Sequence, residues 1–328
     1  MNGDGRRRNQ KGGTYLKKDF DVLTIGVVAY DMILRTIDET LFTRDTTLLQ
    51  EVGVSSGGGA MTQAVVAQRL GCRTALVGKV CTDAFSDYLV KVLQDAGVDY
   101  SNVKVSPNDT MSLTFALVKP NGTRHLLGLQ GSNNRSLGMD DFDLSIVRKA
   151  KIVSYGSFYF LQGLDKGGVT TILSEAKDAG AITVADAAGD MFSQGRNIVF
   201  NNLPLLDYFV PSYVEAMYLT EESSPARMAD FLLKRGGKNV IIKIGVDGCY
   251  VANGEVAQVI PTFNSVKVCD TTGAGDNFVG GFLAGLIDGY DILEAARFAN
   301  AVASISVTGM GAITALQNKQ QVLDLMNR

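Results

Sequence analysis

The segment Asp270-Thr271-Thr272-Gly273-Ala274-Gly275-Asp276, followed by NFVGGFLAGL, is a loop of small residues that leads directly into an apolar helix. Glycine and alanine leave backbone N–H groups bare at the helix start, where the dipole favours an anion. The simplest role for Asp276 is to match that dipole. However, three consecutive small residues before it would form a poor cap for stability alone. The segment therefore predicts a phosphate-binding helix start.

A second glycine cluster, Gly57-Gly58-Gly59-Ala60-Met61-Thr62-Gln63, precedes the helical stretch AVVAQRLG. It is either a flexible turn or a place where a small polar ligand approaches the backbone closely. Two well-known phosphate loops are absent. Gly78-Lys79 and Gly237-Lys238 are not followed by Ser or Thr, as a P-loop requires, and no G-x-G-x-x-G opens a helix after the first strand. Phosphate binding would therefore use a different loop.

Composition indicates a globular protein whose chemistry does not depend on histidine. Of 328 residues, 46% are apolar and 36 are glycine, whereas only 6 are proline, so the glycines are expected at chosen turns. His125 is the single histidine, which excludes metal centres with two or three histidines. It is also the one candidate for a Ser–His or Cys–His mechanism. Chemistry is therefore expected from carboxylates, amides and backbone N–H groups.

Charge is spread unevenly along the chain. Residues 1–18 carry six basic groups and one acid, and the remainder carries 25 basic and 33 acidic residues. An acidic body argues against nucleic acid as a partner, and no apolar run is long enough to span a membrane. Residues 1–19 are predicted to be a disordered basic tail. The 4 cysteines are widely spaced and are expected to be reduced thiols of a cytoplasmic protein.

Apolar runs alternate with amphipathic stretches from residue 20 onward, which predicts one α/β domain over 20–328 with a mostly parallel sheet covered on both faces. The hairpin signal Pro120-Asn121-Gly122 predicts a small β-sheet lid formed by about 30–56 and 100–130. We expect strands at 21–28, 74–77, 111–119, 123–129, 151–155, 182–186, 207–210, 240–244, 248–252 and 256–260. We expect helices at 60–70, 84–96, 140–149, 167–180, 213–219, 225–235, 275–287, 291–307 and 318–326.

Together the two glycine clusters resemble the paired signatures of the ribokinase/PfkB family of carbohydrate kinases. Residues 57–71 are similar to G-G-x-x-x-N-x-A-x-x-x-x-R-L-G, and residues 270–276 match D-T-x-G-A-G-D. The resemblance extends over about 21–326 and is greatest to the sugar-kinase branch. It implies a three-layer α/β/α ribokinase-like fold with an edge lid over the sugar. It also implies transfer of the ATP γ-phosphate to a hydroxyl of a monosaccharide or sugar acid, with Mg²⁺ and, in some members, K⁺.

The resemblance assigns the central chemistry to the second cluster. Asp276 would be the general base that accepts the hydroxyl proton, and the amides of Gly273, Ala274 and Gly275 would form the anion hole. These roles agree with the chemistry, since phosphoryl transfer depends mainly on positioning and charge stabilisation. A general base contributes about 10²–10⁴-fold to such a reaction.

Other positions follow from the same resemblance. On the substrate side these are Asp31, Gly58, Gly59, Thr62, Arg124 and Asn133, with weaker indications for His125 and Asp186. On the nucleotide side they are Ser212, Lys243, Gly245, Gly248, Gly275 and Asn300. Glu215 would order Mg²⁺ through water, and a monovalent cation would be held at Asp270, Thr272 and the carbonyls around Ser306, Gly309 and Gly311.

Departures from the family pattern lie mostly on the sugar side. Thr62 stands where asparagine is usual, and Gly59 replaces a lysine, which makes D-ribose itself less favoured. Ser212 replaces an asparagine that contacts phosphate.

Two other functions stay open: a nucleoside kinase and a non-catalytic sugar- or nucleotide-binding protein. A nucleoside kinase needs an aromatic residue against the base, and the intact Asp276 argues against a pure binding protein. Candidates for the aromatic are Tyr30, Phe158, Tyr159 and Phe160. Lids in this family often pair between subunits, so a homodimer is expected.

Overall fold

The computed structural model describes residues 18–35, 37–120, 124–129 and 131–328. Residues 1–17 of the predicted basic tail and the turn at Asn121-Gly122 lie outside the described residues. Within the described residues, no helix is long and apolar enough to cross a membrane.

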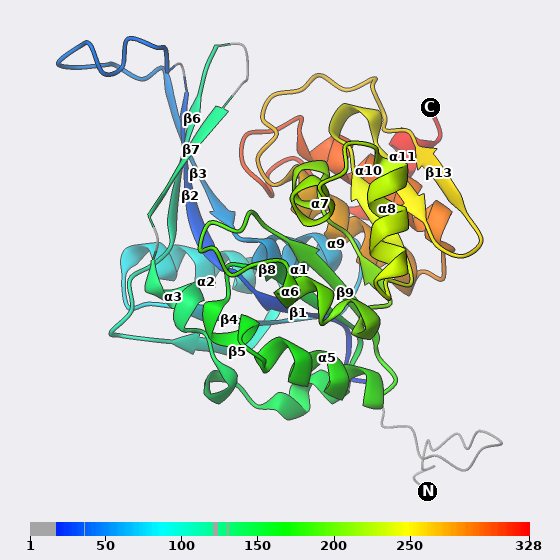
Figure 1. Cartoon of the computed structure of the whole chain (residues 1–328). Helices are drawn as coiled ribbons and strands as arrows, with labels where there is room; N and C mark the ends of the chain where they lie inside the picture. The colour runs from blue at the N-terminus through cyan, green and yellow to red at the C-terminus, as the bar shows by residue number, and fades with distance from the viewer. Residues whose placement is uncertain (1–17, 36, 121–123, 130) are drawn as a thin grey trace, which may run out of the picture.

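A nine-stranded sheet forms the centre of the described chain, in the order β13-β12-β11-β10-β9-β8-β1-β4-β5 (Figure 1). All neighbours from β11 to β5 pair in parallel, and β12 and β13 add an antiparallel edge. Buried Val, Leu and Ile runs place these strands inside, as in parallel sheets covered on both faces. The strands are β1 (Phe20–Gly26), β4 (Thr74–Val80), β5 (Asp99–Val105), β8 (Ala150–Phe158), β9 (Ile182–Ala187), β10 (Tyr208–Phe209), β11 (Val240–Lys243), β12 (Cys249–Ala252) and β13 (Ala257–Ile260).

Helices cover both faces of this sheet, which confirms the predicted three layers. One face packs against α1 (Gly59–Arg69), α9 (Ala274–Ile287), α10 (Ile292–Ser306) and α11 (Lys319–Met326). The other packs against α5 (Gly168–Asp178), α7 (Tyr213–Thr220) and α8 (Pro225–Lys234). Helix α2 (Ala84–Ala96) lies beside α1. Three short helices complete the set: α3 (Ser132–Ser136), α4 (Gln162–Asp165) and α6 (Asn197–Phe200).

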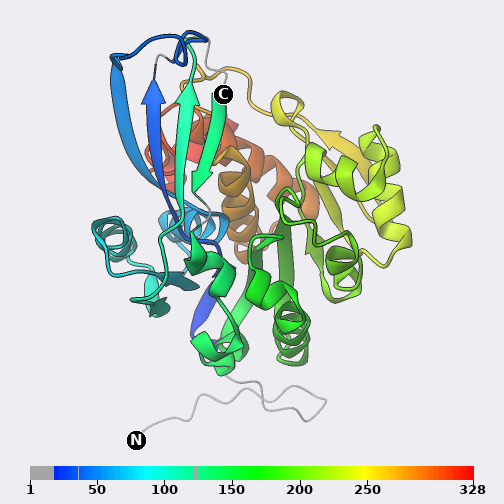
Figure 2. The ribbon, with the colours of Figure 1, turned by 60° about the vertical axis from the view of Figure 1, so that its left-hand side comes forward.

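A separate four-stranded sheet stands at one edge of the molecule, in the order β3-β2-β6-β7 (Figure 2). Its strands are β2 (Ala29–Arg35), β3 (Glu51–Gly57), β6 (Leu113–Val118) and β7 (Arg124–Leu129). The lid was expected to include residues from about 100 onward, but β5 pairs with β4 in the large sheet. The small sheet therefore takes its second pair of strands only from Leu113.

The helix predicted over 140–149 is wrong, because this segment forms two 3₁₀ helices, Met139–Asp141 and Leu144–Lys149. The Asp143 carboxylate accepts hydrogen bonds from the Ser145 amide and hydroxyl. The Asp141 carboxylate accepts one from the amide of Gly138. Short polar side chains that bond to nearby backbone groups compete with a continuous helix.

Two glycines in the middle of α9 allow this helix to pack tightly between its neighbours. A Cβ atom built on Gly280 would lie 2.7 Å from Val66 of α1, and one on Gly281 would lie 2.9 Å from Val302 of α10. Each distance is shorter than a van der Waals contact. The backbone of α9 therefore approaches both helices at positions where a methyl group does not fit.

We predict that Gly280→Ala lowers the free energy of unfolding by about 1 kcal/mol or more, because overpacking outweighs the higher helix propensity of alanine. Urea denaturation followed by circular dichroism measures this change. Gly254→Ala is the matched control, since a Cβ at Gly254 meets open space. A Gly280→Ala protein as stable as the control would contradict the close packing of α9 against α1.

Candidate active site

A cavity of about 630 Å³ lies between the small sheet and the carboxyl ends of the central strands. Both glycine clusters reach it, together with residues from β2, β6 and β7 of the small sheet. The carboxyl ends of parallel strands are the usual place for ligands in open α/β sheets. The predicted site residues in its wall are Asp31, Gly58, Gly59, Thr62, Arg124, Ser212, Glu215, Lys243, Gly245, Thr272, Gly273, Ala274, Gly275 and Asp276.

Asp276 lies in the first turn of α9, at the meeting point of the two glycine clusters. Gly273 is the N-cap residue in the left-handed conformation (φ 71°), and no side chain caps the helix start. A Cβ built on Gly59 would lie 3.1 Å from Asp276 Oδ1, so this carboxylate lies against the start of α1. The arrangement brings bare amides of α9 and a carboxylate to one wall of the cavity.

The surroundings of Asp276 make its carboxyl group harder to ionise than usual. Burial and then the charge of Asp186 raise the pKa of Asp276 to about 7, against the attraction of Lys243. Glu215 and Asp31 add further repulsion that raises this pKa. A carboxylate whose pKa lies near neutrality suits the acceptance of a proton at physiological pH.

Asp31 on β2 approaches the first glycine cluster from the small sheet. A Cβ at Gly57 would overlap both oxygens of the Asp31 carboxylate, so this contact requires glycine. Burial raises the pKa of Asp31 to about 6, although a hydrogen bond with Thr114 and the charge of Arg124 act in the opposite direction. Thr62, also in the cavity wall, is fully buried, and its hydroxyl has no partner in the described part of the chain.

Lys243 and two further acids occupy the other half of the cavity. Lys243 Nζ lies 2.6 Å from Asp186 Oδ2, with the side chains only 11% and 5% exposed. Burial lowers the pKa of Lys243, but the charges of Asp186 and Glu215 more than offset this, so the net shift is upward. Burial and the charge of Asp186 raise the pKa of Glu215 to about 7. A Cβ at Gly275 would lie 3.5 Å from Lys243 Nζ, so the lysine faces the helix start.

Ser212 and Glu215 begin α7 as a capping box. The amide of Ser212 donates to Glu215 Oε2 at 2.6 Å, and the amide of Glu215 donates to Ser212 Oγ at 3.4 Å. Reciprocal bonds of this kind satisfy amides at a helix start. The cap thereby fixes the Glu215 carboxylate beside Asp186 and Lys243.

The segment predicted to hold a monovalent cation is tied together by Asp270. One carboxylate oxygen of Asp270 accepts bonds from the amide and hydroxyl of Thr272, and the other accepts one from the amide of Gly311. Ser306 Oγ donates to the carbonyl of Ala303. Ser306, Gly309 and Gly311 lie outside the cavity wall. These contacts join the two halves of the predicted cation site, residues 270–272 and 306–311. Binding of a cation there stays a prediction.

Besides residues of the predicted cation segment, four other predicted site residues are absent from the cavity wall. Asn300 donates to the carbonyl of Ile260 at 2.9 Å, and Gly248 turns the chain between β11 and β12 with φ 97°. Asn133 is fully buried and is not part of the cavity wall. The expected substrate contact of Asn133 is therefore corrected to a packing role, since its amide is saturated by protein groups. His125 is exposed on β7 and likewise lies outside the wall.

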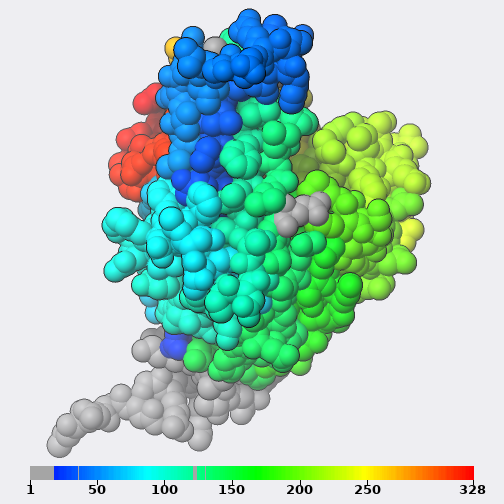
Figure 3. All heavy atoms as spheres, turned by 90° about the vertical axis from the view of Figure 1, so that its left-hand side faces the viewer, coloured from blue at the N-terminus to red at the C-terminus, as the bar shows by residue number. Residues whose placement is uncertain are grey.

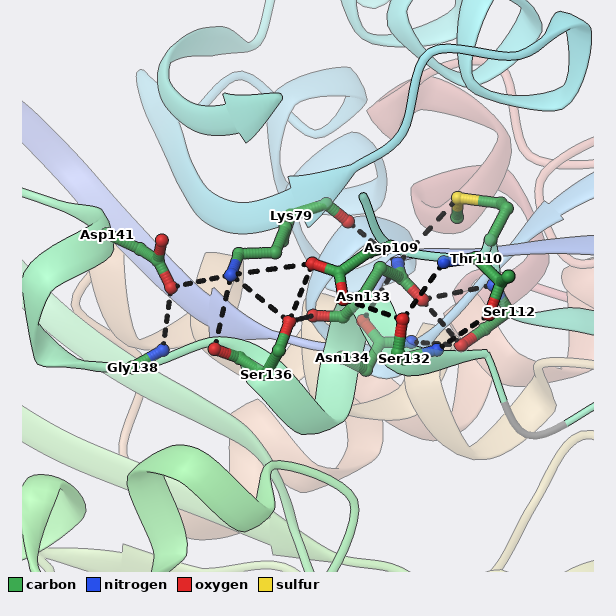
Figure 4. A network of polar contacts seen from close by, with 11 residues as sticks. Lys79, Asp109, Thr110, Ser112, Ser132, Asn133, Asn134, Ser136, Gly138 and Asp141 are labelled. Carbon is green, nitrogen blue, oxygen red and sulfur yellow. Dashed lines mark hydrogen bonds and ion pairs between the residues drawn. The ribbon is translucent and has the colours of Figure 1, made fainter. Parts of the chain in front are cut away.

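Asn133 instead belongs to a polar network at the base of the small sheet (Figure 4). Its Oδ1 accepts bonds from the amide and hydroxyl of Ser112, and its Nδ2 donates to the carbonyls of Val28 and Lys79. Asn134 pairs with both the amide and the carbonyl of Val28. The strands that lead into the small sheet are thus fixed to the end of β4.

The structure also places residues in the cavity wall that the sequence analysis did not single out. Ser157 lies near the carboxyl end of the central strand β8, and that position is the signal that could have indicated it. Of the aromatics considered for a nucleoside, Phe160 lines the cavity, whereas Tyr30 packs against Phe85 and Tyr88. Phe158 and Tyr159 are core residues. Further additions include Thr114, Leu126, Asn134, Arg135, Met191 and Phe192.

Fold and site together define an α/β protein in which the uncapped start of α9 faces a cavity that is bordered by the small sheet and lined by carboxylates. Residues 19–319 match the model of the pfkB family carbohydrate kinases. The chain therefore belongs to this family and is a carbohydrate kinase.

Relatives agree with this assignment. Fructokinase-1 of Zea mays is 27% identical over 286 residues, covering 83% of this chain and 88% of its own. The ribokinase of Haemophilus influenzae is 27% identical over 284 residues, covering 84% and 89%. The ribokinase of Arabidopsis thaliana, solved with ribose and ATP, superposes with a TM-score of 0.78 at 24% identity, covering 94% and 99%.

We predict that Asp276→Asn raises the melting temperature at pH 8 by about 2 °C or more. The folded-state pKa of about 7 exceeds the usual value of 3.8, so Asp276 contributes stability below pH 4 that is lost as the pH rises to 7. Asparagine does not ionise, so the Asp276→Asn variant does not lose this stability. Its higher melting temperature relative to the wild type should disappear toward pH 4. Thermal melts across this range, with the exposed Asp230→Asn as control, provide the measurement. A difference in melting temperature between Asp276→Asn and the wild type that does not change with pH would contradict the raised pKa of Asp276.

Proposed function

We propose that the chain transfers the γ-phosphate of ATP to a hydroxyl of a free monosaccharide or sugar acid, with Asp276 as general base. The observation that carries this proposal is the position of Asp276. Its carboxylate lies beside the uncapped amides of α9 and against Gly59, and its pKa is raised to about 7. A base, an anion site and an acceptor pocket thus meet at one point.

In the proposed step, the acceptor oxygen attacks the γ-phosphorus while its proton moves to the Asp276 carboxylate. A new O–P bond forms, the bond to the β–γ bridging oxygen breaks, and ADP leaves with that electron pair. The amides of Gly273, Ala274 and Gly275 stabilise charge on the transferred group. Lys243 adds a positive charge on the same side, and Asp31 orients acceptor hydroxyls from the small sheet. Adenine would lie toward Gly245, which borders the cavity.

The residues present also fit a magnesium ion. Glu215 and Asp186 supply carboxylates in the phosphate half, and Mg²⁺ in kinase sites is usually bound by one or two carboxylates plus substrate phosphates. When bound, the ion neutralises charge on the β- and γ-phosphates. Capping of α7 by Ser212 holds Glu215 in place for this role. No part of the proposed reaction depends on K⁺ at the Asp270 segment.

A nucleoside kinase of the same family is the second candidate. Phe160 and Phe192 form an edge-to-face pair with centroids 6.2 Å apart, and both line the cavity. Such a pair offers a surface on which a base could stack. Substrate trials that include nucleosides distinguish the two functions.

We predict that the wild-type protein releases ADP with at least one acceptor from a panel of ketoses, aldoses, sugar acids and nucleosides. The Asp276→Asn variant should fold but lose at least about a hundredfold in kcat. Wild-type kcat/KM should fall as the pH drops below about 7, because the base must be ionised. Asp230→Asn serves as the surface control.

Two results would contradict parts of this proposal. ATP binding without ADP release on any acceptor would favour the non-catalytic binding protein. Near-normal turnover in Asp276→Asn would remove Asp276 from the mechanism while leaving kinase activity intact.

We also propose that two copies of the chain pair through the outer faces of their small sheets (Figure 3). On that face, Val52, Val54 and Leu127 are 53%, 44% and 45% exposed. They alternate with residues that face the cavity, such as Asp31 and Leu126. Contiguous exposed apolar surface of this kind marks association sites.

We predict that Leu127→Glu shifts the protein from dimer to monomer, because it places a charge in the apolar contact. Analytical ultracentrifugation measures the change. Leu48→Glu is the control, since Leu48 is 88% exposed outside the four strands. A wild-type monomer at all concentrations would exclude the pairing.

A cytoplasmic location is proposed from the cysteines. All four are free thiols, and Cys72, Cys81 and Cys249 are buried. Absence of disulfides in a chain of this length is typical of reducing compartments.

A further inference from the structure

Helix α3 carries five polar side chains, and four of them are engaged by the protein (Figure 4). Ser132 Oγ donates to Asp109 at 2.6 Å, and Ser136 Oγ donates to the other oxygen of Asp109 at 2.8 Å. Asn133 and Asn134 bind the backbone at the base of the small sheet. These contacts fix the backbone of α3 on both sides of Arg135.

Arg135 is the exception in α3. Its side chain has no hydrogen bond or ion pair within the described ranges, and its Nε is buried without a partner. The residue lines the cavity. A guanidinium has five N–H donors, and burying one of them, here Nε of the half-buried Arg135, without a partner costs free energy. The backbone at Arg135 is thus fixed, whereas its guanidinium has no protein partner in the described part of the chain and is available for a ligand.

Arg124 is a second cation in the same cavity. From β7 it donates a hydrogen bond to Thr272 Oγ1 and acts on Asp31, but it makes no ion pair with a carboxylate in the described part of the chain. Apolar Leu126, Phe160 and Phe192 also line this cavity. Among the carboxylates of the cavity, Asp31 is the one on which Arg124 acts.

The phosphate half shows the opposite balance. There Lys243 already pairs with Asp186, and Glu215 and Asp276 add two further acids. Arg135 belongs to a different part of the cavity, because the neighbouring Asn134 binds the backbone of Val28 just before β2, the strand that carries Asp31. Arg124 and Arg135 thus lie on the side of the small sheet, where the acceptor is proposed to bind.

We propose that the acceptor sugar carries an anionic group, a carboxylate or a phosphate monoester, and that Arg135, assisted by Arg124, binds this group. The proposal rests on the proposed kinase function and narrows its substrate class. The planar guanidinium fork matches both groups by paired hydrogen bonds. Neutral ribose and fructose, the acceptors suggested by the names of the relatives, would leave Arg135 unpaired.

Pairs of acceptors, one anionic and one neutral, test the proposed substrate class. We expect kcat/KM for D-gluconate to exceed that for D-glucose, or that for fructose 6-phosphate to exceed that for D-fructose, by at least about tenfold. The first pair tests a carboxylate and the second a phosphate. Neutral members that perform as well as their anionic partners would overturn the proposal, although the kinase function would stand.

Substitution of Arg135 provides the second test. Arg135→Gln should lower kcat/KM for the preferred anion at least about tenfold, leave neutral acceptors within about twofold, and leave KM for ATP unchanged. Arg227→Gln is the control, because Arg227 is 73% exposed and pairs with Glu222 on the surface. An increased KM for ATP would place Arg135 on the nucleotide and overturn the assignment.

Thermal shift with the acceptor alone supplies a readout that does not need catalysis. The preferred anion should raise the melting temperature of wild-type protein and of Asp276→Asn, but not of Arg135→Gln. Stabilisation without ADP release on any acceptor would overturn the proposed reaction and support the anion site. Equal stabilisation of Arg135→Gln would overturn the anion site.

Discussion

The close packing of α9 between α1 and α10 is the constraint on which the rest of the site depends. Gly280 and Gly281 let the helix approach Val66 and Val302 at distances that no larger residue permits. This contact fixes the N-terminus of α9 against the start of α1. As a result, Asp276 meets Gly59, and two segments more than two hundred residues apart in sequence form one wall of the cavity. The same position brings the uncapped start of α9 into the cavity.

Electrostatic crowding follows from the same geometry. Asp186, Glu215 and Asp276 share one wall with a single lysine. Burial raises the pKa of all three, and the charge of Asp186 raises the pKa of Glu215 and of Asp276 further. Such a cluster works against stability, since stability falls as these groups ionise. A protein with no ligand for this wall would be more stable with neutral side chains there. The unfavourable cluster is consistent with the proposed roles of this wall, in which a bound cation and an accepted proton would offset the charges of the carboxylates.

Features carried by one continuous segment could be predicted from the sequence. Apolar runs and helical stretches predicted the three layers, and the runs 57–63 and 270–276 each contain their own helix start, which the structure places in the cavity wall. Features that depend on side-chain direction could not be predicted in this way. Asn133 and Asn134 are adjacent, yet only Asn134 reaches the cavity. Similarly, β5 has the composition of a lid strand, and only its pairing with β4 assigns it to the large sheet.

The difference between local sequence patterns and side-chain direction explains why the type of reaction is easier to recognise from the sequence than the acceptor. The groups proposed to bind phosphate come mainly from the start of α9, where the short motif 270–276 specifies them. The proposed acceptor contacts come from β2, β7, the start of α1 and α3, four elements that meet only in three dimensions. In this proposal the small sheet supplies Asp31 and Arg124, whereas the body supplies Asp276. A change in the small sheet would then alter which sugar is bound without disturbing the proposed base, and Arg135 lies on α3, at the base of the small sheet.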